Sequence, residues 1–296
     1  MRARWWVVGG AALVVVLAAG IAFFSLRSAS EGDARGGGSS TVDVPPPPGD
    51  GSPSVDASPA AAGTWWRPKA GLTWQWQLSG KLDRSVDAQV YDIDGQDSSA
   101  ADVAALKAAG RRVICYVNAG AFEDWRPDAK RFPKAVLGKD LDGWPGERWL
   151  DIRQWAKLEP ILAARFDTCR AKGFDAVEPD NVDGYANESG FPLTAADQLT
   201  FNRRLAALAH RRGLAVGLKN DVEQAAQLEP YFDFAVNEEC AQYDECGKLA
   251  VFVKAGKPVF HVEYEQESGG FCPESRRLGF SSLRKKPELD AWREVC

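Results

Sequence analysis

An acidic cluster closes one strand-like run of this sequence. Residues 174–184 read FDAVEPDNVDG, in which an apolar run gives way to Glu178, Asp180, Asn181 and Asp183. Carboxylates so close together repel one another and raise one another's pKa, which costs stability unless a positive group or a reaction uses them. Carboxyl groups of this kind suit either glycoside hydrolysis or the binding of a hard divalent cation. The segment is therefore the first candidate for a functional site.

The elements that would position these groups are a series of short β-like runs. Eight such runs occupy residues 73–78, 88–94, 112–120, 148–152, 174–180, 214–221, 232–239 and 258–264. Helical patterns cover 99–109, 154–172, 195–212 and 241–255, each followed by a glycine where a C-cap is expected. Alternating strands and helices pair in parallel through βαβ units. The sequence therefore predicts an α/β protein with a (β/α)8 TIM barrel, with a doubly wound open sheet as the alternative.

Polar side chains gather where the expected strands end. In a barrel, these carboxyl ends lie on one face and carry the active site. The ends carry Asp92, Asp94, Tyr116, Asn118, Asp151, Glu178, Asp180, Lys219, Asn220, Glu238, Glu239, Glu263 and Tyr264. Any one of them could be a helix N-cap. Together they predict one polar, carboxylate-rich site.

Several classes of protein are disfavoured by the remaining composition. The sequence contains neither GxSxG nor GxxxxGK[ST], so no serine-hydrolase or phosphate-loop motif is present. It has no CxxC, and its two histidines, His210 and His261, stand far apart in the sequence, so no zinc site or other cofactor is expected. A net charge of −5 has the wrong sign for a nucleic-acid partner. Eleven tryptophans are compatible with carbohydrate subsites as well as with a core.

The N-terminal part of the sequence predicts export. Arg2 and Arg4 precede a 22-residue uncharged run, 5–26, which exceeds a usual signal-peptide core and suffices for a membrane anchor. Residues 1–30 are thus a signal peptide or a signal anchor, which would be the only contact with a membrane. Residues 31–63 are rich in Gly, Ser, Pro and Ala and predict a disordered linker. Residues 64–296 would form a monomeric barrel that is secreted or anchored outside the cell.

All six cysteines lie in the exported part, which favours disulfides. Cys240 and Cys246 are close enough in sequence to staple a loop. Cys272 could tie down the terminal Cys296. Cys115, in an apolar run, could equally be a buried free thiol, and the partner of Cys169 stays open.

Several runs together resemble glycoside hydrolase family 114. They are ICYVNAG, WRPD, LDGWPGERWLDI, GFDAVEPDNVDGY, GLKND, FAVNEECAQYDEC and PVFHVEY, in matching order between about residues 65 and 265. The resemblance implies a TIM-barrel catalytic domain that hydrolyses chains of α-1,4-linked galactosamine, often partly N-acetylated. It also implies a catalytic pair, the aspartate of EPDN and the glutamate before the E/Q–Cys pair, which are Asp180 and Glu238 here.

The resemblance implies roles for the polar strand ends. Asp180 would attack the anomeric carbon and Glu238 would protonate the leaving oxygen in a retaining mechanism. The other expected substrate-binding residues are Asp92, Asp94, Tyr116, Asn118, Asp151, Glu178, Asn181, Lys219, Glu263 and Trp76. The acidic members would pair with the ammonium groups of galactosamine, and Trp76 could stack on a sugar ring. Lys219 would keep Asp180 ionised, unless it forms a structural ion pair with Asp92 or Glu178.

Two other functions are compatible with the same residues. A barrel that binds amino-sugar polymers at the cell surface without cleaving them would keep an acidic face, and a divalent-metal hydrolase could use Glu178, Asp180 and Asp183 as ligands. The register of the strand near Glu238 also stays open. A shift of one residue would turn Glu239 inward in its place.

Overall fold

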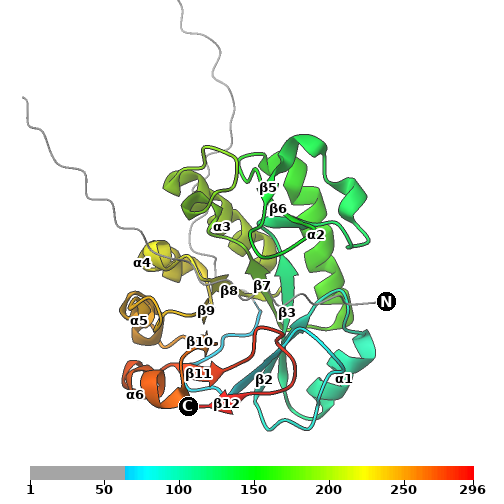
Figure 1. Ribbon diagram of the computed structural model, residues 1–296. Coiled ribbons are helices and arrows are strands. Elements are labelled where there is room, and N and C mark those ends of the chain that lie inside the picture. Colours follow the sequence, from blue (N-terminus) through cyan, green and yellow to red (C-terminus); the bar gives the residue numbers. More distant parts are fainter. Residues whose placement is uncertain (1–63) are drawn as a thin grey trace, which may run out of the picture. The chain divides into compact units, whose positions relative to one another are not determined.

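The computed structural model describes residues 64–296, which form strands and helices in alternating order (Figure 1). The expected N-terminal segment, 1–30, and linker, 31–63, lie outside the described residues. Within the described part, no helix is both long enough and apolar enough to cross a membrane.

The strands and helices have the following bounds. The strands are β1 (Trp74–Gln77), β2 (Val90–Asp94), β3 (Arg112–Asn118), β4 (Ala121–Glu123), β5 (Leu137–Asp140), β6 (Glu147–Leu150), β7 (Ala176–Asp180), β8 (Ala215–Lys219), β9 (Phe234–Glu238), β10 (Val259–Glu263), β11 (Ser281–Arg284) and β12 (Glu294–Val295). The α-helices are α1 (Ala100–Ala108), α2 (Trp155–Lys172), α3 (Ala195–His210), α4 (Ala225–Leu228), α5 (Cys246–Lys254) and α6 (Ser268–Leu278). Short 3-10 helices occupy Ala129–Arg131, Lys134–Val136, Gly184–Ala186, Val222–Gln224 and Glu229–Tyr231.

One curled sheet carries the fold. Its nine strands run in the order β1-β2-β3-β7-β8-β9-β10-β11-β12. Every neighbouring pair from β1 to β11 is parallel, and only β12 is antiparallel to its neighbour. Parallel neighbours that follow chain order are the arrangement of a (β/α)8 barrel. Figure 1 shows the helices around the outside of these strands.

The C-terminal segment lies where β11 and β1 would close the barrel. Among the described residues, no ladder joins these two strands. Instead, β12 pairs with β11, and the backbone N–H of Leu78 donates to the carbonyl of Leu289 at 2.9 Å. The Trp74 indole also donates to the carbonyl of Ser281 at 2.9 Å. The parallel order and the curl of the expected barrel are therefore present, while this seam is joined through the C-terminal segment.

The prediction that residues 148–152 form the fourth strand of the barrel is wrong. Most of it forms β6, which pairs antiparallel with β4 and β5 in a separate three-stranded sheet. The turn between β5 and β6, residues 141–146, is short, and a short turn can join antiparallel strands but not parallel ones. The eighth parallel strand is β11 instead, which has a single large apolar residue, Leu283, and was therefore missed.

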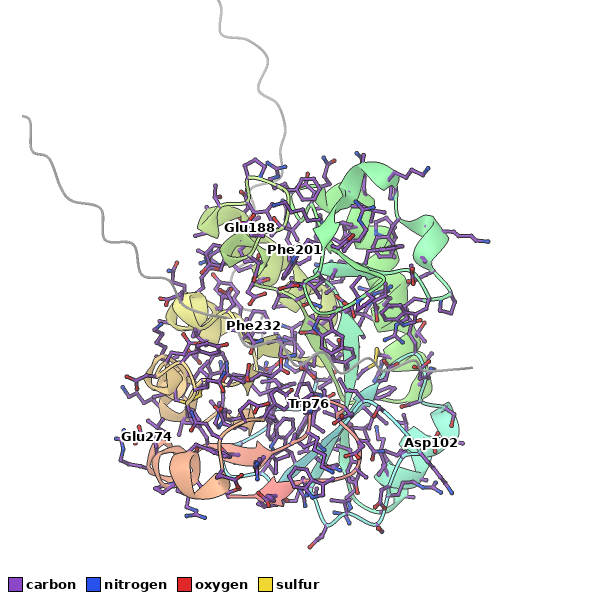
Figure 2. The ribbon with its side chains drawn as sticks, viewed as in Figure 1. Trp76, Asp102, Glu188, Phe201, Phe232 and Glu274 are labelled. Carbon is purple, nitrogen blue, oxygen red and sulfur yellow. A yellow bond between two sulfur atoms is a disulfide. The ribbon has the colours of Figure 1, made fainter. Side chains whose placement is uncertain are left out.

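The curled sheet separates two apolar layers. The larger layer lies between the strands and the helices and includes Phe201 of α3 and Phe232. The smaller one fills the inside of the curl with Trp74, Trp76 and neighbouring side chains. Figure 2 shows Trp76 at the centre of the strands and Phe201 among the surrounding helices. The filled interior closes one end of the curl, so chemistry is confined to the carboxyl ends of the strands.

Candidate active site

The strand period of two residues places the acidic side chains inside the curl. Ala176, Ala215 and Phe234 belong to the inner apolar layer. Side chains point to the same face of a strand at every second position, so Glu178 and Asp180, Lys219, and Glu238 continue these three rows towards the carboxyl ends. The rows change from apolar at the closed end to charged at the open end. The register question at β9 is thereby answered, because Glu238 shares the inner face with Phe234.

Lys219 lies at the centre of the inner carboxylates. Its ammonium nitrogen is 2.9 Å from Asp180 Oδ1, 3.0 Å from Glu238 Oε2 and 3.4 Å from Glu178 Oε1. It also lies 4.8 Å from the centre of the Trp76 ring. Burial lowers the pKa of Lys219, but Asp180, Glu238 and Glu178 outweigh it and hold the pKa well above its ordinary value. The group is therefore a buried cation that binds β7 and β9 together from β8.

Asp180 is held as a carboxylate. Burial raises its pKa, but Lys219 and the Tyr116 hydroxyl outweigh burial, so the pKa lies below the ordinary value. The hydroxyl of Tyr116 donates to Oδ2 at 2.7 Å, and the side-chain amide of Asn181 donates to the same oxygen at 3.3 Å. The side chain keeps 15% of its surface exposed. An ionised, fixed and accessible oxygen is what a nucleophile requires.

Glu238 faces Asp180 across Lys219. The hydroxyl of Tyr264 donates to its Oε1, and its backbone N–H donates to Oδ1 of Asn220 at 3.0 Å. Its side chain is 25% exposed, more than that of Asp180. Two oxygens bound to one nitrogen cannot lie further apart than the sum of their two distances to it. That sum is below the separation of about 6.5–9.5 Å found in inverting glycosidases.

A second, fully buried acid pair lies under Lys219. Asp92 and Glu178 are both 0% exposed, and apart from the ion pair of Glu178 with Lys219, their carboxyl oxygens meet no hydrogen-bond donor outside the pair within the described residues. Burial and then the neighbouring Glu178 raise the pKa of Asp92 well above its ordinary value. Burial likewise raises the pKa of Glu178 to about 7, although Lys219 offsets part of the effect. Their place beneath the open end gives them no direct access to a substrate.

Four other expected site residues have their polar atoms engaged by the protein. Asp94 forms a buried, bidentate pair with Arg126, at 2.7 and 3.2 Å. Asp151 accepts from Arg153 at 2.7 and 3.0 Å and follows β6, outside the parallel sheet. Asn118 donates to Glu147 at 3.0 Å and accepts from the backbone of Ala121. Glu263 points out of the curl and accepts from His261 and from the backbone of Ala241.

Trp76 also lies away from any open surface. Its ring is 1% exposed and packs in the inner layer beneath Lys219, stacked near Trp74 at 6.0 Å between centroids. A sugar ring could not reach it without displacing the charged residues above. The aromatic residues that do line the cleft are Trp144, Tyr185, Tyr243 and Tyr264.

Three disulfides hold the elements that carry the site. Cys240–Cys246 and Cys272–Cys296, both expected, are present, and Cys115–Cys169 is a third. Cys240 lies two residues after Glu238, and its backbone N–H donates to the side chain of Asn237 at 3.1 Å. The loop after β9 is therefore fixed at both ends.

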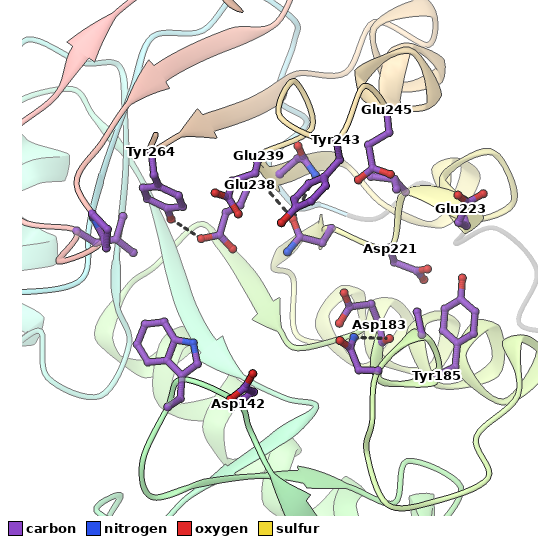
Figure 3. A pocket seen from close by; sticks show the side chains of 18 residues that line it. Asp142, Asp183, Tyr185, Asp221, Glu223, Glu238, Glu239, Tyr243, Glu245 and Tyr264 are labelled. Atoms are coloured by element: carbon purple, nitrogen blue, oxygen red, sulfur yellow. Dashed lines mark hydrogen bonds between the residues drawn. The ribbon is translucent and has the colours of Figure 1, made fainter. Parts of the chain in front are cut away.

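An open cleft of about 750 Å³ lies over the carboxyl ends of the strands. Figure 3 shows it lined by Glu238, Glu239 and Tyr264 on one side and by Asp183, Tyr185 and Asp221 on another. Asp142 and Trp144, from the turn between β5 and β6, complete the rim. Acidic and aromatic side chains dominate the lining. Such a surface suits a cationic or hydroxyl-rich ligand.

Sequence reasoning missed several residues of the cleft and of its surroundings. Tyr264 was noted at a strand end but was given no role, although strand parity from Phe260 and Val262 turns it inward. Tyr185 and Asp221 lie in loops after β7 and β8, where no periodic pattern signals a direction. Glu147 contacts Asn118 from the antiparallel sheet, and burial raises its pKa to about 8. Only the pairing of that sheet brings it there.

Two of the three ligands expected for a metal hydrolase are already paired with a protein cation. Glu178 and Asp180 face the ammonium group of Lys219 rather than one another. The geometric cluster of Cys240, Cys246 and His261 is no better as a metal site, because both sulfur atoms are joined in a disulfide. The arrangement at the strand ends is that of two carboxyl groups with a cation between them.

Comparisons with known proteins agree with the geometry. The model of glycoside hydrolase family GH114 matches residues 55–296. The crystal structure of Ega3 from Aspergillus fumigatus, in complex with galactosamine, is 42% identical, covers 78% of this chain and 97% of its own, and superposes with a TM-score of 0.75. The glycoside hydrolase domain of PelA from Pseudomonas aeruginosa is 16% identical, with a TM-score of 0.58 over 75% of this chain and 96% of its own, and so shares the fold.

A search among curated proteins found no match. The family model nevertheless covers the whole described domain, including the strand ends that carry Asp180, Lys219 and Glu238. The matched Ega3 structure spans most of the same residues at high identity. The chain is therefore a glycoside hydrolase and belongs to family GH114.

Proposed function

We propose that this glycoside hydrolase cleaves α-1,4-linked galactosamine polymers internally, with retention of configuration, by using Asp180 and Glu238. The observation that carries the proposal is the contact of both carboxylates with one ammonium group, that of Lys219, at facing strand ends. The short separation that follows supports retention over inversion. The complex of Ega3 with galactosamine supports an amino sugar as the substrate.

The proposed reaction has two steps. In the first, an Asp180 oxygen attacks the anomeric carbon, the glycosidic C–O bond breaks, and a proton from Glu238 passes to the leaving oxygen. In the second, Glu238 removes a proton from water, whose oxygen attacks the same carbon and releases Asp180 as a carboxylate. Lys219 and Tyr116 stabilise the charge on Asp180 in the free enzyme, and Tyr264 orients Glu238.

The acidic cleft supports a cationic polymer as the ligand. Each unacetylated galactosamine unit carries an ammonium group, and the cleft lining contains Asp142, Asp183, Asp221, Glu239 and Glu245 besides Glu238. Glu223 also lines the cleft, but its charge is taken up by an ion pair with Lys248. Trp144 and Tyr243 also line the cleft and are exposed, so further sugar units of a polymer could stack on them. Such contacts beyond the cleaved unit support internal cleavage.

Two features support action outside the cell. The described domain holds all six cysteines in disulfides, which persist in oxidising compartments. The sequence begins with a basic and then apolar segment that is typical of export. If the protein is anchored, protease added to intact cells should degrade it. If it is secreted, it should be detected in the culture medium. Protection until the cells are lysed would contradict export.

The catalytic pair is tested with the purified full-length chain on partly deacetylated α-1,4-galactosaminan. We expect the wild type to release oligosaccharides, and Asp180→Asn and Glu238→Gln to lose activity by at least about 10³-fold while still binding the polymer. Proton NMR of the first product formed should show the α-anomer. Binding without cleavage by the wild type would favour the sugar-binding module, and a β-anomer would contradict retention.

A further inference from the structure

A second acidic group lies in the same cleft, apart from Lys219 and the proposed catalytic pair. It consists of Asp183, Tyr185 and Asp221, from the loops after β7 and β8. Figure 3 shows the three side chains along one wall of the cleft. Asp183 raises the pKa of Asp221, and Asp221 raises the pKa of Tyr185, as expected for groups that lie close together.

Asp221 is buried and only half satisfied. Its residue is 5% exposed, and Oδ2 accepts from the amide of Asn202 at 2.8 Å. Oδ1 accepts no well-aligned hydrogen bond from the described residues, and the Tyr185 hydroxyl is its neighbouring donor, although Asp221 lines the cleft. Leaving a buried carboxylate oxygen unpaired costs stability, so a structure that keeps one at a ligand cleft offers it to a donor from outside.

Buried side chains behind Asp221 hold it in place. The amide of Asn202 also donates to the carbonyl of Val182 at 2.9 Å, and Asn202 accepts from the Gln198 amide at 2.9 Å. Both residues lie on α3 and are 0% exposed. The carboxyl group of Asp221 is therefore fixed before any ligand arrives, which reduces the entropic cost of binding.

The charge state of the group favours a cationic ligand. Burial raises the pKa of Asp221 to about 8, against the opposing influence of Tyr185 and Asn202, and burial raises the pKa of Asp183 to about 6. Among the described residues, no lysine or arginine forms an ion pair with either carboxyl group. A cation placed between them would relieve their repulsion and stabilise both charged forms.

We propose that Asp183, Tyr185 and Asp221 form a subsite that binds the ammonium group of a galactosamine unit next to the one that is cleaved, and so selects a deacetylated unit there. Oδ1 of Asp221, which is buried in the cleft wall beside the Tyr185 hydroxyl, is the acceptor for this ammonium group. An N-acetyl group in the same place would bring a neutral amide and extra bulk to a buried carboxyl group. The inference rests on the proposed galactosamine substrate and adds the position at which a free amine is required.

Kinetics of Asp221→Asn test the subsite. The substitution keeps the shape and a side-chain acceptor for Asn202, and asparagine tolerates the left-handed backbone of this position, where φ is 45°. We expect kcat/KM on fully deacetylated galactosaminan to fall about tenfold or more, mainly through KM, because a charged hydrogen bond is lost. On heavily N-acetylated polymer, kcat/KM should stay within about twofold of the wild-type value.

Glu223→Gln is the matched control. Glu223 lines the same wall of the cleft but is exposed and pairs with Lys248. This variant should retain the wild-type preference for deacetylated polymer. Asp183→Asn provides a second test if Asp221→Asn does not fold, and it should shift the preference in the same direction. Equal losses on both polymers, or a shift in Glu223→Gln as large as that in Asp221→Asn, would overturn the subsite.

Calorimetry of binding separates this inference from the proposed reaction. A deacetylated oligosaccharide is titrated into the Asp180→Asn variant in two buffers that differ in ionisation enthalpy, near pH 7. Because Asp221 is mostly protonated at this pH before binding, we expect binding to release protons. The double variant Asp180→Asn with Asp221→Asn should release fewer protons. If the wild type cleaves neither polymer, the proposed function fails, but proton release that depends on Asp221 would still support the subsite. Unchanged release would overturn it.

Discussion

At the scale of single residues, the site depends on how one cation is shared. Lys219 contacts Asp180, Glu238 and Glu178, and the first two are the residues that the resemblance singles out. The sequence alternatives for Lys219 were control of Asp180 or a structural ion pair with Asp92 or Glu178. The structure shows contacts with both Asp180 and Glu178, so one side chain can control charge and also join three strands.

Replacing Lys219 with methionine should impair chemistry more than binding. Without the ammonium group, burial dominates at Asp180 and its pKa rises from its lowered value. We expect kcat to fall about 10²-fold or more, with a smaller change in the dissociation constant, because the proposed reaction needs an ionised Asp180 only for attack. The acidic limb of kcat/KM against pH should also move to higher pH. An unchanged kcat, or an acidic limb at the wild-type pH, would exclude this role.

Gly120 is a position where a neighbouring backbone segment, at Asn181, lies too close for any side chain. A Cβ built there would lie 1.7 Å from the carbonyl oxygen of Asn181, and the N–H of Gly120 donates to the carbonyl of Asp180 at 3.0 Å. Gly120→Ala should therefore displace the backbone that carries Asp180 and lower kcat by about tenfold or more. Gly247→Ala is the control, because a Cβ there meets nothing within 4 Å. Equal activity of the two variants would contradict this account.

At the scale of elements, the alternating direction of side chains along each strand decides which residues face the site. The loop after β9 depends on a disulfide for its position. Strands β7, β8 and β9 bring Asp180, Lys219 and Glu238 to one face because their inner rows are in register. The loop after β9 is held by the Cys240–Cys246 disulfide. By contrast, Cys115–Cys169 joins β3 to α2 in the core, on the outer side of the sheet.

The two disulfides should therefore differ in what their loss changes. Cys240 and Cys246 are 6 residues apart and Cys115 and Cys169 are 54 apart. Loop-closure entropy then gives about 2 kcal/mol for the first disulfide and about 4 kcal/mol for the second. Cys240→Ser with Cys246→Ser should lower kcat/KM about tenfold with a modest fall in Tm. Cys115→Ser with Cys169→Ser should lower Tm more and leave kcat of the folded enzyme near the wild-type value. The reverse ranking in either measurement would contradict this division.

At the scale of the whole molecule, the interior holds more carboxyl groups than cations to neutralise them. Burial raises the pKa of Glu147 and Asp221 to about 8, of Glu178 to about 7 and of Asp183 to about 6. These carboxyl groups titrate near pH 4 in the unfolded chain. Between about pH 4 and 8 the folded protein therefore binds more protons than the unfolded one, and stability falls as pH rises through this window.

Thermal unfolding against pH tests this sign. We expect Tm of the wild type to be higher near pH 5 than near pH 7.5 and to fall steadily between them. Asp221→Asn and Glu147→Gln should each flatten the fall, because each removes one group with a raised pKa. Asp167→Asn is a surface control, since this carboxylate is exposed and pairs with Arg212. A Tm that rises with pH in the wild type would contradict the raised pKa values.

The sequence by itself determined the repeating strand–helix order, the family resemblance and the residues of the central cluster, because strand ends and short motifs are local features. EPDN, GLKND and NEEC each lie on one strand end, so Asp180, Lys219 and Glu238 could be named without knowing which strands are neighbours. Only the tertiary structure decided that 148–152 leaves the parallel sheet, that β11 replaces it, and that Trp76 and Glu263 lack access to the cleft. Asp221 acquires its unpaired oxygen only when α3 packs behind its loop. Pairing, burial and the direction of loop side chains arise from contacts between residues far apart in the chain, which no local pattern encodes.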